Sequence, residues 1–231
     1  MADSNNIPDL LSSIGKNIVS EGVFERFPEL VPAIGFNYWS KNHSKLLLVA
    51  ESNYFSDDLE NKSVFKDFEN WYKGENCSLI PEEKKKDVSN WKGDYPTFNN
   101  LFNSMKTVLN EAHIEFDNYL FQETIFYNYF LRPATKKNGK IGFKKDCKPI
   151  DKEVSGLALC GIIKAYSPNL IIFTSKYAWE EFCKYCQREK LKFDTIKIDF
   201  VYHPSRHLSW YHRYGFGKQK FEDILKKYWI Y

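Results

Sequence analysis

The sequence lacks the features that would place the chain in a membrane or outside the cell. No apolar run within its 231 residues approaches the length of a membrane span. The first residues, MADSNNIPDLLSSIG, have neither a basic region nor a long apolar core, so we expect no secretion signal. Cysteine is scarce and odd in number, five in all, which favours free thiols in a reducing compartment. We therefore expect a cytoplasmic protein without membrane contact.

A strong net charge and internal repeats are also missing. The net charge of +3 and the pI of about 8.4 permit nucleic-acid binding without requiring it. The lack of a repeat argues against a solenoid or an array. Aromatic residues, in contrast, make up 17% of the chain, and we expect most of them to fill the core and a few to be available for stacking on bases or sugars.

The stretch Lys45–Phe55 (KLLLVAESNYF) joins a short apolar run to a series of polar side chains. Leu46–Val49 is too short for a free helix and is bounded by polar residues, which predicts a buried strand of a parallel sheet. In open α/β sheets, ligands bind beyond the carboxyl ends of the strands. The stretch Asp199–Arg206 (DFVYHPSR) has the same form, a strand followed by a His-Pro-Ser turn. We expect the function to lie where these two strand ends meet.

Strand and helix patterns alternate along the rest of the chain. The predicted strands cover residues 45–51, 119–130, 169–174 and 195–202. The predicted helices cover residues 96–112, where Thr97 is the expected cap, 151–165, 176–189 and 217–228. This alternation is typical of a parallel sheet with helices on both faces. We predict one domain over residues 1–231, an α/β fold arranged as a three-layer α/β/α sandwich with a central four-stranded parallel sheet and an N-terminal helical extension at residues 1–40.

Three segments have two interpretations each. Residues 56–96 form either a solvated insertion with a short helix near 64–73 or a flap over the crevice. The basic stretch Arg132–Lys148 (RPATKKNGKIGFKKDCK) is either solvated surface or a loop that holds phosphates. Cys183 and Cys186 form a lone CxxC pair, which is a weak metal signal, and we expect core or surface thiols without a metal.

Five short blocks occur in one order between residues 45 and 228: VAESNYF, PTFNNLF, FYNYFLRP, SPNLIIFTSKYAWEEF, and VYHPSR followed by GFGKQKFEDIL. Together they resemble the motifs of the uracil-DNA glycosylase superfamily. The resemblance implies the glycosylase-like fold and hydrolysis of the N-glycosidic bond of uracil or another modified base in single- or double-stranded DNA. The base would be flipped into a pocket. The iron–sulfur branch has a cysteine pair ahead of the first motif. Here no cysteine precedes Cys77, so we expect no iron–sulfur cluster. We also expect no other cofactor, and we favour a monomer.

The resemblance also assigns roles to individual residues. The uracil-reading Asn of the family matches Asn128, and the motif His matches His203, which Pro204 follows. The water-activating Asp of the family falls on Ser52 and its Pro falls on Asn53, while Glu51 matches the carboxylate of the iron–sulfur branch. The other substrate-binding candidates are Tyr54 and Phe55 for shaping the pocket and stacking, Ser205 and Arg206 for phosphate, and His207 as the wedge in the base stack, with Leu208 beside it.

The chemistry of bond cleavage fits three of these residues. Positive charge develops on the sugar and negative charge on the departing base, so the site needs a carboxylate near C1′ and a donor near the base oxygen. Glu51 suits the first role and His203 the second. Asn128 offers a donor and an acceptor side by side, which matches the edge of a pyrimidine. The structural alternatives are an Asn128 amide bonded to a neighbouring backbone group and a His203 that caps a turn.

Two further functions remain open. A chain without the Asp and the Pro of the first motif can be a catalytically silent module that binds nucleic acid, a nucleotide or a protein partner, since a fold does not fix a function. A Ser-His hydrolase would use Ser52 as its nucleophile and His203 or His207 as its base. The sequence AESN, however, lacks the flanking glycines of a nucleophile elbow.

Overall fold

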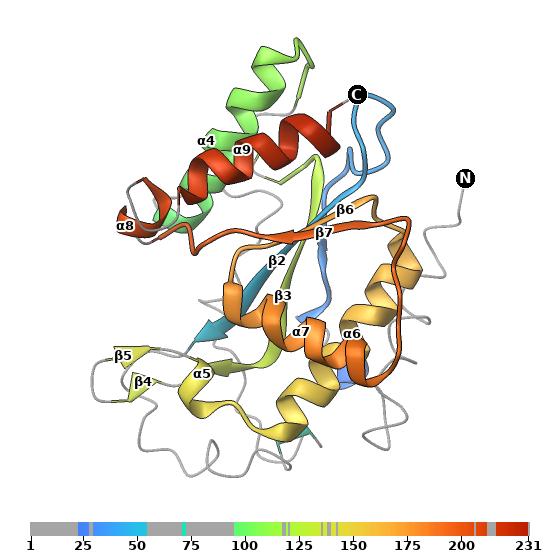
Figure 1. Ribbon diagram of the computed structural model, residues 1–231, viewed down its shortest axis with the longest axis vertical. Helices are drawn as coiled ribbons and strands as arrows, with labels where there is room; N and C mark the ends of the chain where they lie inside the picture. The colour runs from blue at the N-terminus through green and yellow to red at the C-terminus, as the bar shows by residue number, and fades with distance from the viewer. Residues whose placement is uncertain are drawn as a thin grey trace.

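The computed structural model describes residues 23–27, 30–54, 71–72, 95–116, 119, 121–134, 136–137, 140–141, 143–205, 207–211 and 216–230. The fold is α/β, with a five-stranded mixed sheet in the order β1–β3–β2–β6–β7 and helices on both of its faces (Figure 1). This arrangement is consistent with a three-layer α/β/α sandwich. Within the described ranges, no helix is both long and apolar enough to cross a membrane.

The sheet contains four parallel strands, β2 (Leu46–Tyr54), β3 (Thr124–Ala134), β6 (Leu170–Phe173) and β7 (Lys197–Phe200). A fifth strand, β1 (Ala33–Ile34), pairs antiparallel with β3 at one edge. The prediction of a four-stranded, wholly parallel sheet was therefore wrong in this detail, as was the helical assignment of residues 33–34. A strand of two residues shows no periodicity that a sequence pattern can reveal.

The approach of β1 to β3 depends on Gly35. Its N–H donates to the carbonyl of Thr124 at 2.8 Å. A Cβ at this position would lie 2.1 Å from the carbonyl oxygen of Gln122, which is far inside van der Waals contact. Only glycine therefore lets the chain run this close to β3.

The four long helices lie close to their predicted positions: α4 (Pro96–Glu111), α6 (Pro149–Tyr166), α7 (Lys176–Arg188) and α9 (Gly217–Tyr228). The short helices are α2 (Val23–Arg26), α5 (Phe143–Asp146) and α8 (His207–Trp210). The predicted cap of α4 was wrong, because Tyr95 occupies the N-cap position and Thr97 is buried in the first turn. Asp151 lies at N3 of α6 rather than at its cap and accepts a bond from the backbone N–H of Lys148 at 2.7 Å.

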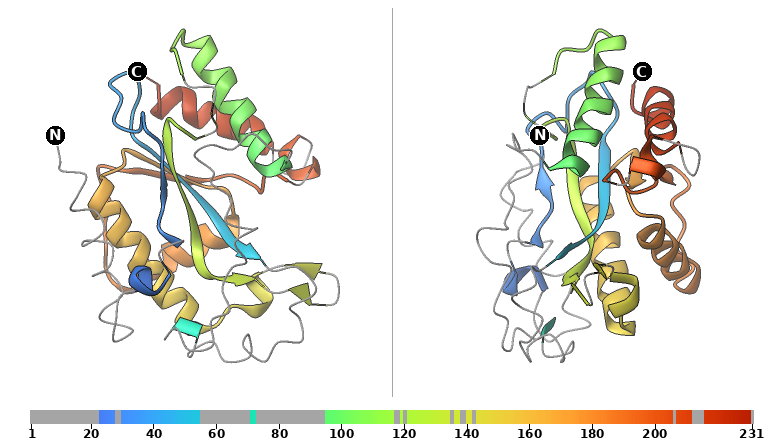
Figure 2. Two further views of the ribbon diagram at one scale, coloured as in Figure 1. Left: turned by 180° about the vertical axis from the view of Figure 1, so that it is seen from behind. Right: turned by 90° about the vertical axis from the view of Figure 1, so that its left-hand side faces the viewer.

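Side chains of the sheet enter two cores, because successive residues of a strand point to opposite faces. Leu47 and Val49 of β2 pack into a core shared with α6 and α7. Leu46 and Leu48 pack into a second core shared with α4 and α9. Figure 1 and the left view of Figure 2 both show α4 and α9 on one side of the sheet and α6 and α7 on the other. This division into an α4 side and an α7 side decides where each candidate residue lies.

Arg132 belongs to the core rather than to a phosphate-binding loop. Its Nε and Nη2 atoms donate to the two carboxylate oxygens of Asp151 at 2.8 and 2.7 Å, and both side chains are fully buried. The hydroxyl of Tyr72 donates to the same carboxylate at 2.7 Å. This buried bidentate pair holds Arg132 away from the surface, so Arg132 is not one of the exposed cations of the basic stretch.

The remaining part of the basic stretch is a small hairpin, β4 (Lys136–Lys137) with β5 (Lys140–Ile141), followed by α5. Most of the predicted insertion at residues 56–96, and with it the flap, lies outside the described residues. Its described residues include Trp71, which stacks on Phe27 with ring centroids 4.3 Å apart. Trp71 and Tyr72 both pack into the α7-side core.

Candidate functional site

The central strand β2 runs past the end of its neighbour β6. The pairing of β2 with β6 ends at Val49 and Phe173, whereas its pairing with β3 continues to Tyr54. The strand predicted to end near residue 51 therefore continues to Tyr54. Since Glu51, Ser52 and Asn53 have no β6 partner, they form a half-exposed strand end beside the start of α7.

Glu51 reaches the N-terminus of α7. Its Oε2 atom accepts a hydrogen bond from the Ser175 hydroxyl at 2.5 Å. Ser175 is the N-cap of α7, and its Oγ atom accepts from the backbone N–H of Ala178 at 3.3 Å. A carboxylate is stabilised at this end of a helix because the first N–H groups and the helix dipole present positive potential. The strand end thus holds an anionic oxygen in a fixed place.

An aromatic side chain at the start of α7 lies near Glu51. Burial raises the pKa of the Tyr177 hydroxyl, and Cys147 and Glu51 add to this effect. The ring of Tyr177 stacks on that of Phe130 with centroids 5.4 Å apart. The ammonium of Lys144 lies 5.5 Å from the Tyr177 ring centroid. Lys144 is thus a described residue of the basic stretch that contacts Tyr177 at the start of α7.

The amide of Asn128 is bonded to another amide. Its Nδ2 atom donates to Oδ1 of Asn53 at 3.1 Å, from β3 to the adjacent strand β2. Asn128 is half-buried, and the residues before and after it in the strand are buried. This bond uses one of its two N–H groups, and an amide has a second N–H and a carbonyl oxygen with which to bind a ligand. The Asn128 amide is therefore bonded to a side chain, not only to neighbouring backbone groups.

The His203 turn is held by α4. The carbonyl of Pro204 accepts a bond from Nδ2 of Asn100 at 2.7 Å, and the Tyr211 hydroxyl donates to Oδ1 of the same Asn100 at 2.6 Å. Nδ1 of His203 accepts from the backbone N–H of Ser205 at 3.2 Å and lies 2.7 Å from its hydroxyl. Because a backbone N–H can only donate, Nδ1 carries a lone pair, and the ring proton of a neutral His203 is on Nε2.

The candidates divide between the two sides of the sheet. Asn128 pairs with Ala50 and follows Phe126 by two residues, and both of these pack on the α4 side. The strand register shifts between Ser52 and Tyr54, and such an irregularity re-aims side chains, which brings Asn53 to Asn128. The His203 turn is bonded to α4 and therefore adjoins the same side. Glu51 follows Leu47 and Val49, so its side chain leaves the sheet on the α7 side.

Other predicted site residues have less definition. The side chains of Tyr54, Arg206 and His207, and all of Phe55, lie outside the described residues. Ser205 is exposed, and Leu208 on α8 is 62% exposed. In the described part of the chain no hydrogen bond joins Ser52 to His203, and the side chain of His207, the other candidate base of a Ser-His hydrolase, is not described.

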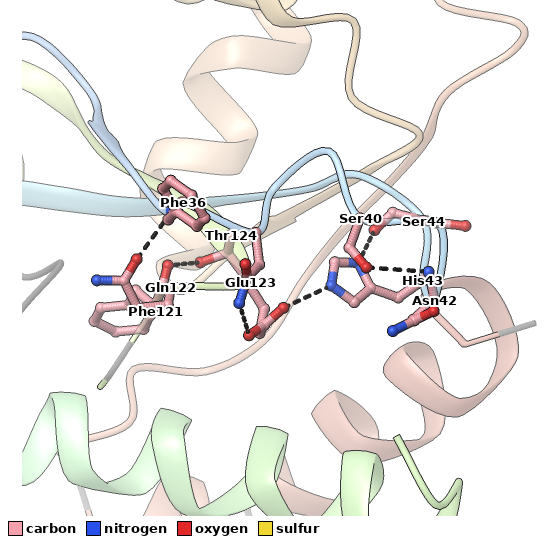
Figure 3. Close-up of polar contacts among 10 residues, drawn as sticks. Phe36, Ser40, Asn42, His43, Ser44, Phe121, Gln122, Glu123 and Thr124 are labelled. Carbon is pink, nitrogen blue, oxygen red and sulfur yellow. Dashed lines mark hydrogen bonds and ion pairs between the residues drawn. The ribbon is translucent and has the colours of Figure 1, made fainter. Parts of the chain in front are cut away.

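A second polar cluster lies at the opposite, amino end of the sheet (Figure 3). Nε2 of His43 is 3.0 Å from Oε2 of Glu123, and Nδ2 of Asn37 donates to Oε1 of Glu123 at 2.8 Å. Nδ1 of His43 lies 3.1 Å from the carbonyl oxygen of Ser44, and the ring packs on Trp229 with centroids 5.0 Å apart. The side chain of His43 is fully buried. This cluster is closed by protein atoms, so we assign it a structural role.

Two site residues were missed in the sequence. Ser175 follows a predicted strand and precedes a predicted helix, which is the signal of an N-cap, so its place at the sheet edge was open to prediction. Asn100 lies within α4, which was predicted from the helical spacing of its apolar residues. Nothing in the sequence indicates that Asn100 bonds the His203 turn.

The described residues contain no group of three or more His, Cys, Asp or Glu side chains that could hold a metal ion. The comparisons with known proteins leave the site to be interpreted from its own geometry. No family model matches this chain, and a search of the curated proteins found no match.

Proposed function

We propose that this protein is a divergent member of the uracil-DNA glycosylase superfamily, with the fold of that superfamily, that binds a modified base in DNA and hydrolyses its N-glycosidic bond. The observation that carries the proposal is the shared α4 side of Asn128 and the His203 turn. The neutral His203 ring has its proton on Nε2, which is the donor that a departing base oxygen requires. The amide of Asn128 supplies a donor and an acceptor for the edge of the base.

Glu51 would supply the carboxylate. It lies one residue after Ala50, the partner of Asn128 in the neighbouring strand, and its oxygen is held by Ser175. A carboxylate fixed near C1′ stabilises the developing sugar cation or orients the attacking water. The exposed Lys144 beside Tyr177 would contact a DNA phosphate at the rim. DNA is thus the partner we propose.

A second function is favoured by one observation. Glu51 leaves the sheet on the α7 side and is bonded to Ser175, whereas Asn128 faces the α4 side. If Glu51 and Asn128 stay on opposite sides of the sheet when a ligand is bound, the protein would recognise a base without cleaving its N-glycosidic bond. That protein would be a catalytically silent module for a nucleic acid or a nucleotide.

Base release separates the two functions. The substrates are single-stranded and duplex DNA that contain uracil or hypoxanthine, and binding to the same DNA is measured in parallel. We expect the parent to release a base, and Glu51→Gln and Asn128→Ala each to reduce the rate by about 100-fold or more. Glu111→Gln removes a carboxylate that is 54% exposed at the far end of α4, and it should keep the parent rate.

The outcomes point in different directions. No release with DNA binding that Asn128→Ala weakens would replace the glycosylase with the silent module. Release that survives in Glu51→Gln would remove Glu51 from the mechanism. Neither release nor DNA binding would overturn the glycosylase and the nucleic-acid form of the silent module.

A further inference from the structure

Helices α6 and α7 approach each other closely at Gly156. A Cβ at this position would lie 2.3 Å from ring atoms of Tyr185 on α7, so only glycine admits that ring. The contact brings the next turn of α6, which carries Cys160, beside the residue after Tyr185, which is Cys186. The close approach of the two helices therefore places two thiols together on the α7 side of the sheet.

The two thiols lie close to each other. Cys160 and Cys186 pack against the same core and influence each other electrostatically, both are half-buried, and both are free. Cys183 lies one turn before Cys186 on α7 and is exposed. Because no group of three metal-ligating side chains occurs in the described ranges, this pair is not a metal site there.

The interaction between the two thiols makes the two sulfurs chemically different. It lowers the pKa of Cys186, whose thiolate the neighbouring Cys160 thiol stabilises, and it raises the pKa of Cys160. The pKa of Cys183 is raised, because its sulfur is partly shielded from solvent although the residue as a whole is exposed, and because Cys186 and Glu180 lie near it. Since the thiolate is the nucleophile in thiol–disulfide exchange, Cys186 is the sulfur prepared to react first and Cys160 the sulfur placed to react second.

We propose that Cys160 and Cys186 form a reversible redox pair, which a low-molecular-weight disulfide oxidises to a bond between α6 and α7. The Cys186 thiolate attacks one sulfur of the small disulfide, and a thiolate leaves and takes up a proton. The Cys160 thiol then loses its proton and attacks the Cys186 sulfur of the mixed disulfide, and the second small thiolate leaves. The protein loses two electrons and two protons, and the small disulfide becomes two thiols.

Peptide mapping tests this proposal. The reduced protein is incubated with oxidised glutathione, the remaining thiols are alkylated, and the digest is analysed by mass spectrometry. We expect the parent to yield a Cys160–Cys186 cross-linked peptide that disappears after reduction with dithiothreitol. Cys160→Ser should accumulate glutathione on Cys186, because the second step is blocked. Cys186→Ser should react at Cys160 at least ten times more slowly than the parent, since the activated thiolate is gone.

Cys183→Ser is the matched control, because it removes the exposed thiol of the same helix and should leave the cross-link unchanged. Circular dichroism of each variant shows whether it is folded. A parent that takes up glutathione on Cys183 without a Cys160–Cys186 cross-link would overturn the proposal. So would a cross-link that is lost in folded Cys183→Ser. The assay needs no substrate, so its result does not depend on the glycosylase function.

Discussion

The two ends of one sheet hold polar clusters that differ in their exposure. At the amino end, His43 and Glu123 are buried, and their hydrogen bonds go to each other and to neighbouring protein atoms. At the carboxyl end, Glu51 and Asn53 are half-exposed, and each is bonded to a side chain of the adjacent element. Both clusters combine carboxylates with amides or hydroxyls, so composition alone does not distinguish them. Exposure marks the carboxyl end as the cluster that can receive a ligand.

The comparison has an energetic side. A polar group that loses its partner in a buried place keeps the full cost of having left water, whereas at an exposed place water replaces the partner. Changes at the amino end should therefore act on stability, and changes at the carboxyl end chiefly on binding and catalysis.

The largest effect is expected for Glu123→Ala. The change leaves His43 and Asn37 without their buried acceptor, and we expect a loss of about 3 kcal/mol in the free energy of unfolding, measured by urea denaturation. Glu123→Gln keeps one oxygen acceptor and should lose less. A loss below about 0.5 kcal/mol for Glu123→Ala, the size of a surface change, would show that the amino-end cluster is not structural.

Ser175→Ala should have a smaller effect on stability. It removes the N-cap of α7 and the hydroxyl that bonds Glu51, which should cost about 1 kcal/mol in the same measurement. Ser175→Thr retains the hydroxyl and should stay near the parent value. If Ser175→Ala proved as damaging as Glu123→Ala, the contrast between the two ends of the sheet would fail.

The smallest effect is expected at Asp199 of the edge strand β7. Burial alone would raise the pKa of this carboxyl, but the hydrogen bond from Lys220 at 2.8 Å and the N–H of Phe200 outweigh it and lower the pKa below 3.8. The stabilisation is therefore present above the ordinary pKa and is lost as pH falls through the lowered value. The Lys220 side chain is 36% exposed, so solvent screening limits the contribution to less than about 1 kcal/mol.

Urea denaturation of the parent and Asp199→Asn at two pH values measures this contribution. The parent should be the more stable protein near pH 7, and most of the difference should be gone near pH 2. A difference that grows as the pH falls would contradict the assigned direction of the pKa shift.

The parts of the fold with a strong period were predictable from the sequence. Helix α9 begins at Gly217 and ends at Tyr228 as predicted, because its apolar residues recur at helical spacing. β6 reads as an unbroken apolar run because both of its faces are buried. β1 has two residues and no period, and its pairing depends on the missing Cβ of Gly35, a property that becomes visible only against β3.

The candidate residues could be assigned to strands from the sequence, but their contacts could not. Glu51 and Asn128 lie on the adjacent strands β2 and β3, with Glu51 near the carboxyl end of β2 and Asn128 in the middle of β3. The side of the sheet that each residue faces depends on the strand register. Because the last residues of β2 are polar, the sequence does not show that this strand extends past the end of β6. The burial of Arg132 could not be predicted, because its partner Asp151 comes from another element and a basic run gives no sign of which member is buried.

The central position of β2 has a consequence for the order in which the chain is made. Leu46 is synthesised long before its partners in the sheet, Thr124 and Leu170. On the ribosome, the apolar run Leu46–Val49 therefore emerges before β3 and β6 have been synthesised. Such an exposed apolar run is a segment that a chaperone would bind. Contacts between such distant residues slow folding, so we expect the sheet to close late, after the helices have begun to form.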